Sequence, residues 1–416
     1  MTTGAVTTRG SSGFSSGRFC IRRNCRHNHT LASSERAMLE PPLPKVVVIG
    51  GSIAGLSTGI ALRCLGCDVQ IYEQSPTSLQ GRGGGLVVQY EMLDWMASHG
   101  IAALATLSLP GVERQFLDRS GRVIQRFPDS TPFTSWEAVF HQLREAFPKE
   151  FYHQDCQCAR VSTASGRPVV EFASGGSIEA DLVIGADGLG SVVRHHLFPE
   201  VRPVYAGYVA WRGVFPESAA PSEVVETLAR RFTLFQGRDF HLLSYLIPGG
   251  RGELSKGSRR LNWVWYWNTN EERELPEILR DRAGRAHRSS VPAGKVQEQH
   301  IATLQQRADQ HLPAVLAQLV RSTPEPFIQV IYDLRTPAMS QGAVAILGDS
   351  ACIVRPHTAA GTSKASGDAV SLAQHLQAAN FDLSHALPLW QTERLAVAQR
   401  LIHHGWQLAR NSGLGR

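Results

Sequence analysis

KVVVIGGSIAGLSTGIALRCLGCDVQIYE, residues 45–73, has the pattern of a strand, a glycine-rich turn, a helix and a second strand. Val46–Ile49 is uninterruptedly apolar, which is typical of a parallel strand buried on both faces. Gly55–Leu65 predicts a helix that ends at Gly66. Asp68–Glu73 predicts the second strand. The stretch therefore predicts a compact β-α-β unit, the building block of a nucleotide-binding domain.

The turn between the first strand and the helix is similar to a dinucleotide-binding fingerprint. That fingerprint needs glycine at its first, third and sixth positions, for the tight turn, for close approach of a pyrophosphate and for helix–strand packing. Gly50 and Gly55 match, and Ser52 replaces the third glycine with a small residue whose hydroxyl could bind phosphate or cap the helix. Ile53 and Ala54 lie at the helix N-terminus, where N–H groups and partial positive charge attract phosphate.

An acidic residue closes the second strand. Glu73 follows Gly50 by 23 residues, where a carboxylate is expected to bind the ribose of an adenosine. A glycine-rich turn alone is equally compatible with a purely structural loop. The strand, turn, helix, second strand and terminal acid together favour nucleotide binding.

Two more motifs follow predicted buried strands. DLVIGADGLGS spans residues 181–191 and QGAVAILGDSA spans residues 341–351. Asp187 lies two residues after Gly185, just beyond the predicted strand Leu182–Ile184, and Asp349 directly follows Gly348, just beyond Val344–Leu347. The carboxyl edge of a parallel sheet is where ligands bind, so these aspartates suit a hydroxyl-rich partner.

These three motifs in this order resemble the group A flavoprotein aromatic hydroxylases, which use FAD and NADH or NADPH, over residues 45–405. The resemblance implies an α/β fold: a Rossmann-like FAD-binding domain of the p-hydroxybenzoate hydroxylase type with an inserted antiparallel β-sheet substrate domain. It assigns the first motif to the ADP part of FAD, and Gly348 and Asp349 to the ribityl chain. Asp187 is either linked to the cofactor or a helix cap.

Three other segments resemble the 2,6-dihydroxypyridine 3-monooxygenase branch of that family: RGGGLVVQ (82–89), YVAWRG (208–213) and RPHTAAGTSKA (355–365). The resemblance places Gly85 and Val87, and also Gln74 after the acid, at the cofactor. The chain departs from the family pattern at Gln74 and at Trp136, because the family usually has arginine at both positions.

The resemblance implies hydroxylation of an electron-rich ring, of the hydroxypyridine or phenol type, through a flavin C4a-hydroperoxide. Small aromatic substrate, O2 and NAD(P)H are the expected partners. The N–H groups of Gly361, Thr362 and Ser363, at the start of a predicted helix, could approach the pyrimidine end of the flavin. Pro356 is expected near C4a.

His357 is the expected base for the substrate hydroxyl, because it lies between Pro356 and the helix start, and histidine titrates near neutrality. Packing is the alternative for any one of the 16 histidines. Four side chains on predicted strands are expected to contact substrate or simply to pack: Tyr208, Arg212, His241 and Tyr245.

The middle of the chain has the composition of a separate sheet. Its predicted strands are Tyr205–Phe215, Arg231–Phe235, His241–Ile247 and Leu261–Trp267. Trp263, Trp265 and Trp267 alternate along one strand and are expected in a core or an interface. A polar loop over 270–296, a helix over Val296–Arg321 that Pro313 could kink, a hairpin of Val169–Phe172 with Ser177–Glu179 and a helix over Thr358–Ala379 complete the prediction.

Composition is that of a globular protein: 416 residues, 43% hydrophobic and 19% charged, with a formal net charge of +6. Residues 1–43 contain six arginines and two glutamates, so +4 of that charge lies in the tail and +2 in the rest. No basic stripe interleaved with aromatic residues appears elsewhere, so nucleic acid is not an expected partner. The run Val46–Leu62 contains too many glycine and small polar residues for a membrane span.

We expect a tail over 1–43, a first part of the FAD-binding domain over 44–204, a mainly β substrate domain over 205–335, and the remainder of the FAD-binding domain with C-terminal helices over 336–416. The tail is a transit peptide, a disordered extension, or an over-long gene start with Met38 as the true one. Seven irregularly spaced cysteines favour reduced thiols, no metal site and a cytoplasmic location, with the mitochondrion as the minor alternative.

Two other functions remain open from the sequence. One is an FAD monooxygenase for another ring, such as a salicylate, a hydroxynicotinate or a urate. The other is a non-catalytic flavin-binding protein. The assembly is a monomer or a homodimer, and the sequence does not distinguish NADH from NADPH.

Overall fold

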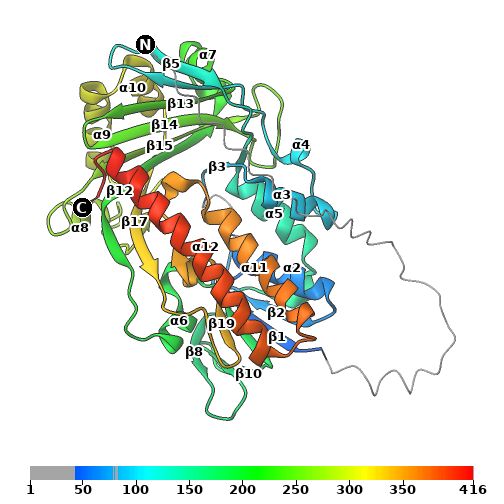
Figure 1. Cartoon of the computed structure of the whole chain (residues 1–416). Coiled ribbons are helices and arrows are strands. Elements are labelled where there is room, and N and C mark those ends of the chain that lie inside the picture. The colour runs from blue at the N-terminus through cyan, green and yellow to red at the C-terminus, as the bar shows by residue number, and fades with distance from the viewer. Residues whose placement is uncertain (1–42, 78, 80–82, 416) are drawn as a thin grey trace, which may run out of the picture. The chain divides into compact units, whose positions relative to one another are not determined.

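The computed structural model describes residues 43–77, 79 and 83–415 (Figure 1). Nearly all of the expected tail, and Arg82 of the RGGGLVVQ segment, lie outside these residues. Within them, no helix is long and apolar enough to cross a membrane.

A six-stranded sheet carries the nucleotide-binding motifs. All neighbouring strands are parallel except the first pair, which is antiparallel. In spatial order the strands are β18 (Ser340–Gln341), β19 (Val344–Ile346), β11 (Leu182–Gly185), β1 (Lys45–Ile49), β2 (Asp68–Tyr72) and β7 (Tyr152–His153). Val46, Val47 and Val48 are fully buried, as their uninterrupted apolar run predicts. The predicted strands of the three motifs are thereby confirmed.

Helices pack around this sheet (Figure 1). α2 (Ile53–Cys64) follows β1 and packs against α11 (Gly361–Ala378), which lies beside α12 (Leu383–Asn411). The helix predicted over Thr358–Ala379 is therefore real but begins three residues later. The other helices of this region are α3 (Tyr90–Ser98), α4 (Leu104–Leu107), α5 (Trp136–Ala146) and α6 (Val192–Leu197).

Two small sheets accompany the six-stranded one. The predicted hairpin is confirmed as β9 (Val169–Phe172) and β10 (Ser177–Glu179), and β8 (Cys158–Ser162) adds a third strand. The segment that contains Gly85 forms β3 (Gly85–Val87), which pairs with β6 (Phe133–Ser135).

A nine-stranded sheet forms the second large layer, with all four predicted strands in it. Its members are β16 (Ser290–Val291), β17 (Phe327–Arg335), β12 (Val204–Pro216), β15 (Arg260–Asn268), β14 (Phe240–Ile247), β13 (Arg231–Gly237), β4 (Glu113–Leu117) and β5 (Val123–Pro128), with β20 (Cys352–Ile353) paired to β17.

Two strands of this sheet come from the part of the chain before residues 205–335. β4 and β5 precede that segment, and β4 pairs in parallel with β13. β5 is exposed along its whole length, so no alternation of apolar and polar residues identifies it as a strand. Its position at the sheet edge explains that exposure.

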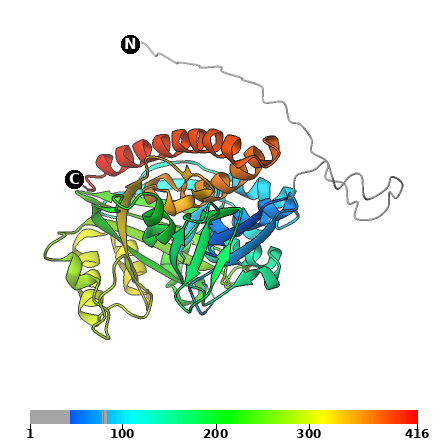
Figure 2. The same cartoon turned by 90° about the horizontal axis from the view of Figure 1, so that it is seen from below.

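Helices cover one face of the large sheet. α9 (Glu298–His311), α10 (Ala314–Arg321) and α7 (Ser222–Leu228) pack there in one hydrophobic cluster with the tryptophans. Figure 2 shows α8–α10 on the side of the sheet away from α12. The single helix predicted over Val296–Arg321 is interrupted at Leu312–Pro313, because proline cannot donate the helical hydrogen bond. The predicted loop over 270–296 also contains α8 (Leu275–Ile278) and β16.

Candidate active site

The first glycine-rich turn has the close packing that the motif demands. Gly50 has φ +103°, a conformation that favours glycine, and its N–H donates to the Tyr72 carbonyl at 2.8 Å. A Cβ on Gly55 would lie 1.9 Å from the Gly50 carbonyl oxygen, so only glycine fits there. Ser52 precedes the first turn of α2, but its side chain makes no capping hydrogen bond. Its hydroxyl, and the helix N–H groups beyond it, thus remain available to a phosphate.

Glu73 shapes this turn. Its carboxylate accepts hydrogen bonds from the Gly51 and Ser75 N–H groups, both at 2.8 Å. Tyr152 donates its hydroxyl to the Gly51 carbonyl at 2.9 Å, a contact that the sequence pattern did not reveal. Glu73 is buried, whereas Gln74 is exposed. The expected contact of Glu73 with a ribose stays a prediction.

Asp187 acts as a helix cap, the alternative that the sequence left open. Its carboxylate accepts from Val192 N–H at 2.7 Å and from the Ser191 hydroxyl at 2.5 Å. It also contacts the Ser350 hydroxyl at 3.2 Å, which links the GADG turn to the GDS turn. Burial raises the pKa of Asp187, and these hydrogen bonds oppose that rise. Asp187 therefore holds two cofactor motifs together through protein groups.

Asp349 is differently placed. Its side chain is exposed, and no hydrogen bond to it is formed by any group that the structure describes. The surrounding protein nevertheless raises its pKa, which the Lys364 charge opposes. Because the carboxyl group of Asp349 is accessible and yet surrounded by protein atoms, it lies in a recess that a ligand hydroxyl could enter. Gly348, with φ +60°, makes the turn that exposes Asp349.

A buried ionic cluster supports that turn. Lys364 on α11 donates to the Gly348 carbonyl at 3.1 Å and to Asp368 at 2.9 Å. Asp368 also accepts from the Gly348 N–H at 3.1 Å and from Arg394 of α12 at 2.8 Å. The sequence did not identify this cluster because it joins two helices, with Arg394 lying 26 residues beyond Asp368.

The start of α11 is open. Gly361, Thr362 and Ser363 form its first turn, and Ala360 before them offers no side-chain cap. The free N–H groups and the helix dipole there can stabilise negative charge. Pro356 is exposed beside it, and Ala359 has the uncommon φ of +54°, which turns the chain into the helix.

His357 belongs to a cluster of rings between this loop and the large sheet. Its Nε2 lies 2.8 Å from the Tyr208 hydroxyl. The ring centroids of Tyr266 and His241 lie 4.6 Å and 5.0 Å from that of His357. The Nδ1 atoms of His357 and His241 are buried without a partner among the described residues. Tyr266 was not predicted from the sequence to be a site residue.

Burial keeps both histidines neutral. It lowers the pKa of His241 to about 4 and, with the charges of His241 and Arg355, lowers the pKa of His357 well below its usual 6.5. Arg355 is itself paired with Asp333 at 2.7 Å. A neutral imidazole can take a proton from a ligand, but the resulting cation would be poorly tolerated, so the proton must move on.

The four side chains expected to contact substrate share one face of the large sheet. Tyr208 and Arg212 lie four residues apart on β12, and His241 and Tyr245 lie four residues apart on β14, so each pair faces one side of its strand. The register of the strands puts all four side chains on the same face of the sheet. Gly85 of β3 donates its N–H to Asn262 at 2.8 Å, which brings β3 against this face. Val87 follows on β3 and is half-buried.

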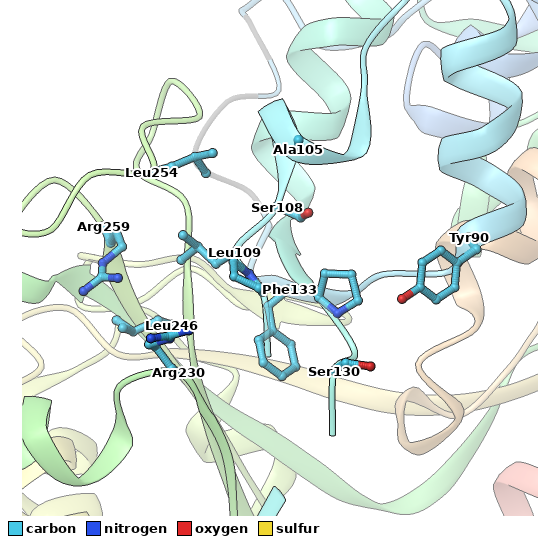
Figure 3. A pocket seen from close by; sticks show the side chains of 12 residues that line it. Tyr90, Ala105, Ser108, Leu109, Ser130, Phe133, Arg230, Leu246, Leu254 and Arg259 are labelled. Carbon is cyan, nitrogen blue, oxygen red and sulfur yellow. The ribbon is translucent and has the colours of Figure 1, made fainter. Parts of the chain in front are cut away.

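One cavity lies elsewhere (Figure 3). It measures about 600 Å³ and lies near Leu246, five residues, or roughly 16 Å, along β14 from His241. Phe133 of its wall stacks on Tyr245 at 4.7 Å between ring centroids. Its lining is Tyr90, Ala105, Ser108, Leu109, Pro110, Ser130, Pro132, Phe133, Arg230, Leu246, Leu254 and Arg259. None of the predicted site residues lines this cavity, although Tyr245 contacts its wall through Phe133.

The residues present fit FAD. The Gly50–Gly55 turn leads into α2, whose N-terminus has no side-chain cap, Asp349 has a carboxylate without a hydrogen-bond partner among the described residues, and the N-terminus of α11 is uncapped. The Gly50–Gly55 turn and Asp349 follow β1 and β19 at one edge of the six-stranded sheet, and Lys364 joins the start of α11 to Gly348 at that edge.

Comparison with known proteins agrees with this geometry. Residues 205–333 match a family described as FAD binding domain-like. The 2,6-dihydroxypyridine 3-monooxygenase of Paenarthrobacter nicotinovorans is 35% identical over 88% of this chain and 94% of its own. The 6-hydroxynicotinate 3-monooxygenase of Bordetella bronchiseptica is 27% identical over 88% of this chain and 93% of its own.

A solved structure, that of the 2,6-dihydroxypyridine-3-hydroxylase from Arthrobacter nicotinovorans, superimposes with a TM-score of 0.85 at 34% identity, covering 90% of this chain and 94% of its own. The fold is therefore that of the FAD-dependent hydroxylases, with NAD(P)H as the reductant typical of the class. The chain belongs to the FAD-dependent aromatic monooxygenases and hydroxylates an aromatic ring.

Proposed function

We propose that the ring hydroxylated by this chain is a hydroxylated pyridine, and that His357 takes the proton from a ring hydroxyl. The two relatives named above act, by their names, on 2,6-dihydroxypyridine and 6-hydroxynicotinate. The observation that carries the proposal is the geometry of His357, whose Nδ1 is buried with no partner among the described residues while its Nε2 lies 2.8 Å from the Tyr208 hydroxyl.

The overall reaction balances as ring–H, O2, NAD(P)H and H⁺ giving ring–OH, H2O and NAD(P)⁺. FAD, when bound, carries electrons from NAD(P)H to O2 and delivers one oxygen atom to the ring. In this proposal the Gly50–Gly55 turn binds its pyrophosphate, Glu73 its adenosine ribose, Asp349 its ribityl chain and the start of α11 its ring.

His357 has one tautomer suited to this task. When Nε2–H donates to the Tyr208 oxygen, Nδ1 carries the lone pair that can accept the substrate proton. Loss of that proton makes the ring more electron-rich and so a better nucleophile toward oxygen. The proton then leaves His357, because Arg355 and burial disfavour a lasting imidazolium.

The test is His357→Asn, which keeps the approximate size of the side chain but takes no proton at neutral pH. We expect FAD content and melting temperature close to wild type and hydroxylation lower by at least about tenfold. Peroxide release per NAD(P)H should rise, since the ring reacts less well. The deficit should shrink as pH approaches the substrate's own pKa.

The matched control is His385→Asn, an exposed histidine at the start of α12, which should behave as wild type. A His357→Asn protein that hydroxylates 2,6-dihydroxypyridine at the wild-type rate from about pH 6 to about pH 9 contradicts the role of His357. Turnover of phenols but of no hydroxypyridine contradicts the substrate class.

A further inference from the structure

We propose that Arg212 and Asn262 form a binding site for an anionic oxygen of the substrate, a ring oxyanion or a carboxylate. This inference rests on the proposed function and adds to it the charge of the ligand and the place that holds that charge. It follows from hydrogen-bond donors without partners on the face of the large sheet that His357 contacts.

Arg212 is a partly buried cation without a counter-ion. No carboxylate lies within ion-pair distance of it among the residues that the structure describes. Its one hydrogen bond is from Nη1 to the Gln329 side-chain oxygen at 2.9 Å, and its Nε is buried without a partner. An uncompensated buried charge is costly, which is explained if a bound ligand supplies the missing anion.

Asn262 supplies a second unpaired donor at the same place. Its Oδ1 accepts from the Gly85 N–H at 2.8 Å, which fixes the orientation of the amide. The Nδ2 group is then buried without a hydrogen bond of good geometry, and the Tyr245 side chain across the strands is its polar neighbour. A Cβ on Gly84 would lie 2.4 Å from Arg212 Nη2 and 3.2 Å from Asn262 Oδ1, so both side chains pack against one glycine.

The electrostatics of the surrounding rings agree with a free positive charge. Burial raises the pKa of Tyr245 and raises that of Tyr266 to about 12, and in both cases the charge of Arg212 opposes the rise. The other arginine near the ring cluster, Arg355, is neutralised by Asp333. His241 and His357 are neutral. Arg212 therefore supplies the uncompensated positive charge on this face.

The two polar regions lie at opposite ends of the site. Tyr208, which binds His357, precedes Arg212 on β12 by four residues, or roughly 13 Å. Both side chains lie on the same face of β12. A ring held by an oxyanion at Arg212 can thus present a second, protonated hydroxyl to His357. The ligand class is an aromatic ring with one ionised oxygen group and a separate ionisable hydroxyl.

The experiment measures ligand binding to the FAD-loaded protein by the change in flavin absorbance, apart from turnover. The probes are 2,6-dihydroxypyridine, 6-hydroxynicotinate and salicylate as anions, and neutral unsubstituted pyridine. Arg212→Met should weaken binding of the anions by at least about tenfold, while the affinity for pyridine stays unchanged. Asn262→Ala should give a smaller loss of the same selectivity, and Arg212→Lys should recover part of the affinity.

Arg307→Met is the control, since Arg307 lies over the Trp267 ring on the opposite face at 4.7 Å and should not alter anion binding. FAD content and melting temperature of each variant are measured in parallel. Equal losses for anions and pyridine, loss of FAD alone, or failure of every anion to bind the wild type overturns the proposal. If His357→Asn keeps both the anion selectivity and the wild-type rate of hydroxylation, the binding site at Arg212 is supported and the role of His357 as the base is contradicted.

Discussion

The two faces of the nine-stranded sheet are built by alternate residues of the same strands, yet they serve different ends. One face carries Trp263 and Trp265, closed over by α9 and α10 in a continuous apolar cluster. The other carries Tyr266, His241 and Arg212 beneath the His357 loop. A strand sends successive side chains to opposite sides, so one set of strands supplies both a core and a site.

The buried polar atoms that lack hydrogen-bond partners belong to different kinds of side chain on the two faces. On the tryptophan face they are the indole N–H groups of Trp211 and Trp265, single weakly polar atoms on large apolar rings. On the other face they belong to imidazole, guanidinium and amide groups. Groups of the second kind are costly to leave unpaired and are what a polar ligand would satisfy. Substitutions on the tryptophan face should therefore change mainly the stability of the protein, and substitutions on the other face should change mainly ligand binding and catalysis.

The largest effect is expected on the tryptophan face. Trp263 is fully buried, and its indole N–H donates to the Thr323 hydroxyl at 2.8 Å. Trp263→Ala should lower the free energy of unfolding by about 3–5 kcal/mol, because it leaves a cavity in the core. Chemical denaturation of the FAD-loaded protein measures this. A loss below about 1 kcal/mol would mean that this face is not the main core of the sheet.

The next effect concerns the site face and depends on pH. The folded pKa of His241 is about 4, against about 6.5 when unfolded. Between these values the unfolded chain binds a proton that the folded chain does not, so stability falls as pH decreases, by up to about 1.4 kcal/mol per pH unit. His241→Asn does not titrate and should flatten the melting temperature against pH in this window.

The exposed His385→Asn should leave that pH dependence as in the wild type. An unchanged slope in His241→Asn would show that His241 is solvated and titrates normally, and would remove the argument that the ring cluster is held neutral.

Much of the fold and part of the site could be predicted from local sequence. The β-α-β unit, the turns after β11 and β19, and the placement of Tyr208, Arg212, His241 and Tyr245 on strands of one sheet all follow from periodicity and motif spacing. Periodicity did not find β5, whose residues are exposed throughout. Pro313 indicated a kink, and the structure has a complete break there between α9 and α10. Such features depend on what packs beside a segment.

The parts of the site that were missed are contacts between distant residues. Tyr266 meets His357 only because β15 pairs with β14 in a particular register. Asn262 faces Gly85, 177 residues away. The Lys364, Asp368 and Arg394 cluster likewise forms only when α11 packs on α12. A single sequence carries no signal for which polar residues will meet across that distance.

The smallest expected effect compares the loss of one hydroxyl on each face. Thr323→Val leaves the buried Trp263 N–H without its acceptor and should cost about 1–2 kcal/mol of unfolding free energy. Tyr266→Phe removes a hydroxyl that makes no hydrogen bond with the described residues, and should change stability by less than about 0.5 kcal/mol. Both variants are compared by denaturant unfolding under one set of conditions. A larger loss of stability for Tyr266→Phe than for Thr323→Val would show that polar groups on the site face already have hydrogen-bond partners in the protein. A smaller loss for Tyr266→Phe supports a face whose polar groups are available to a ligand.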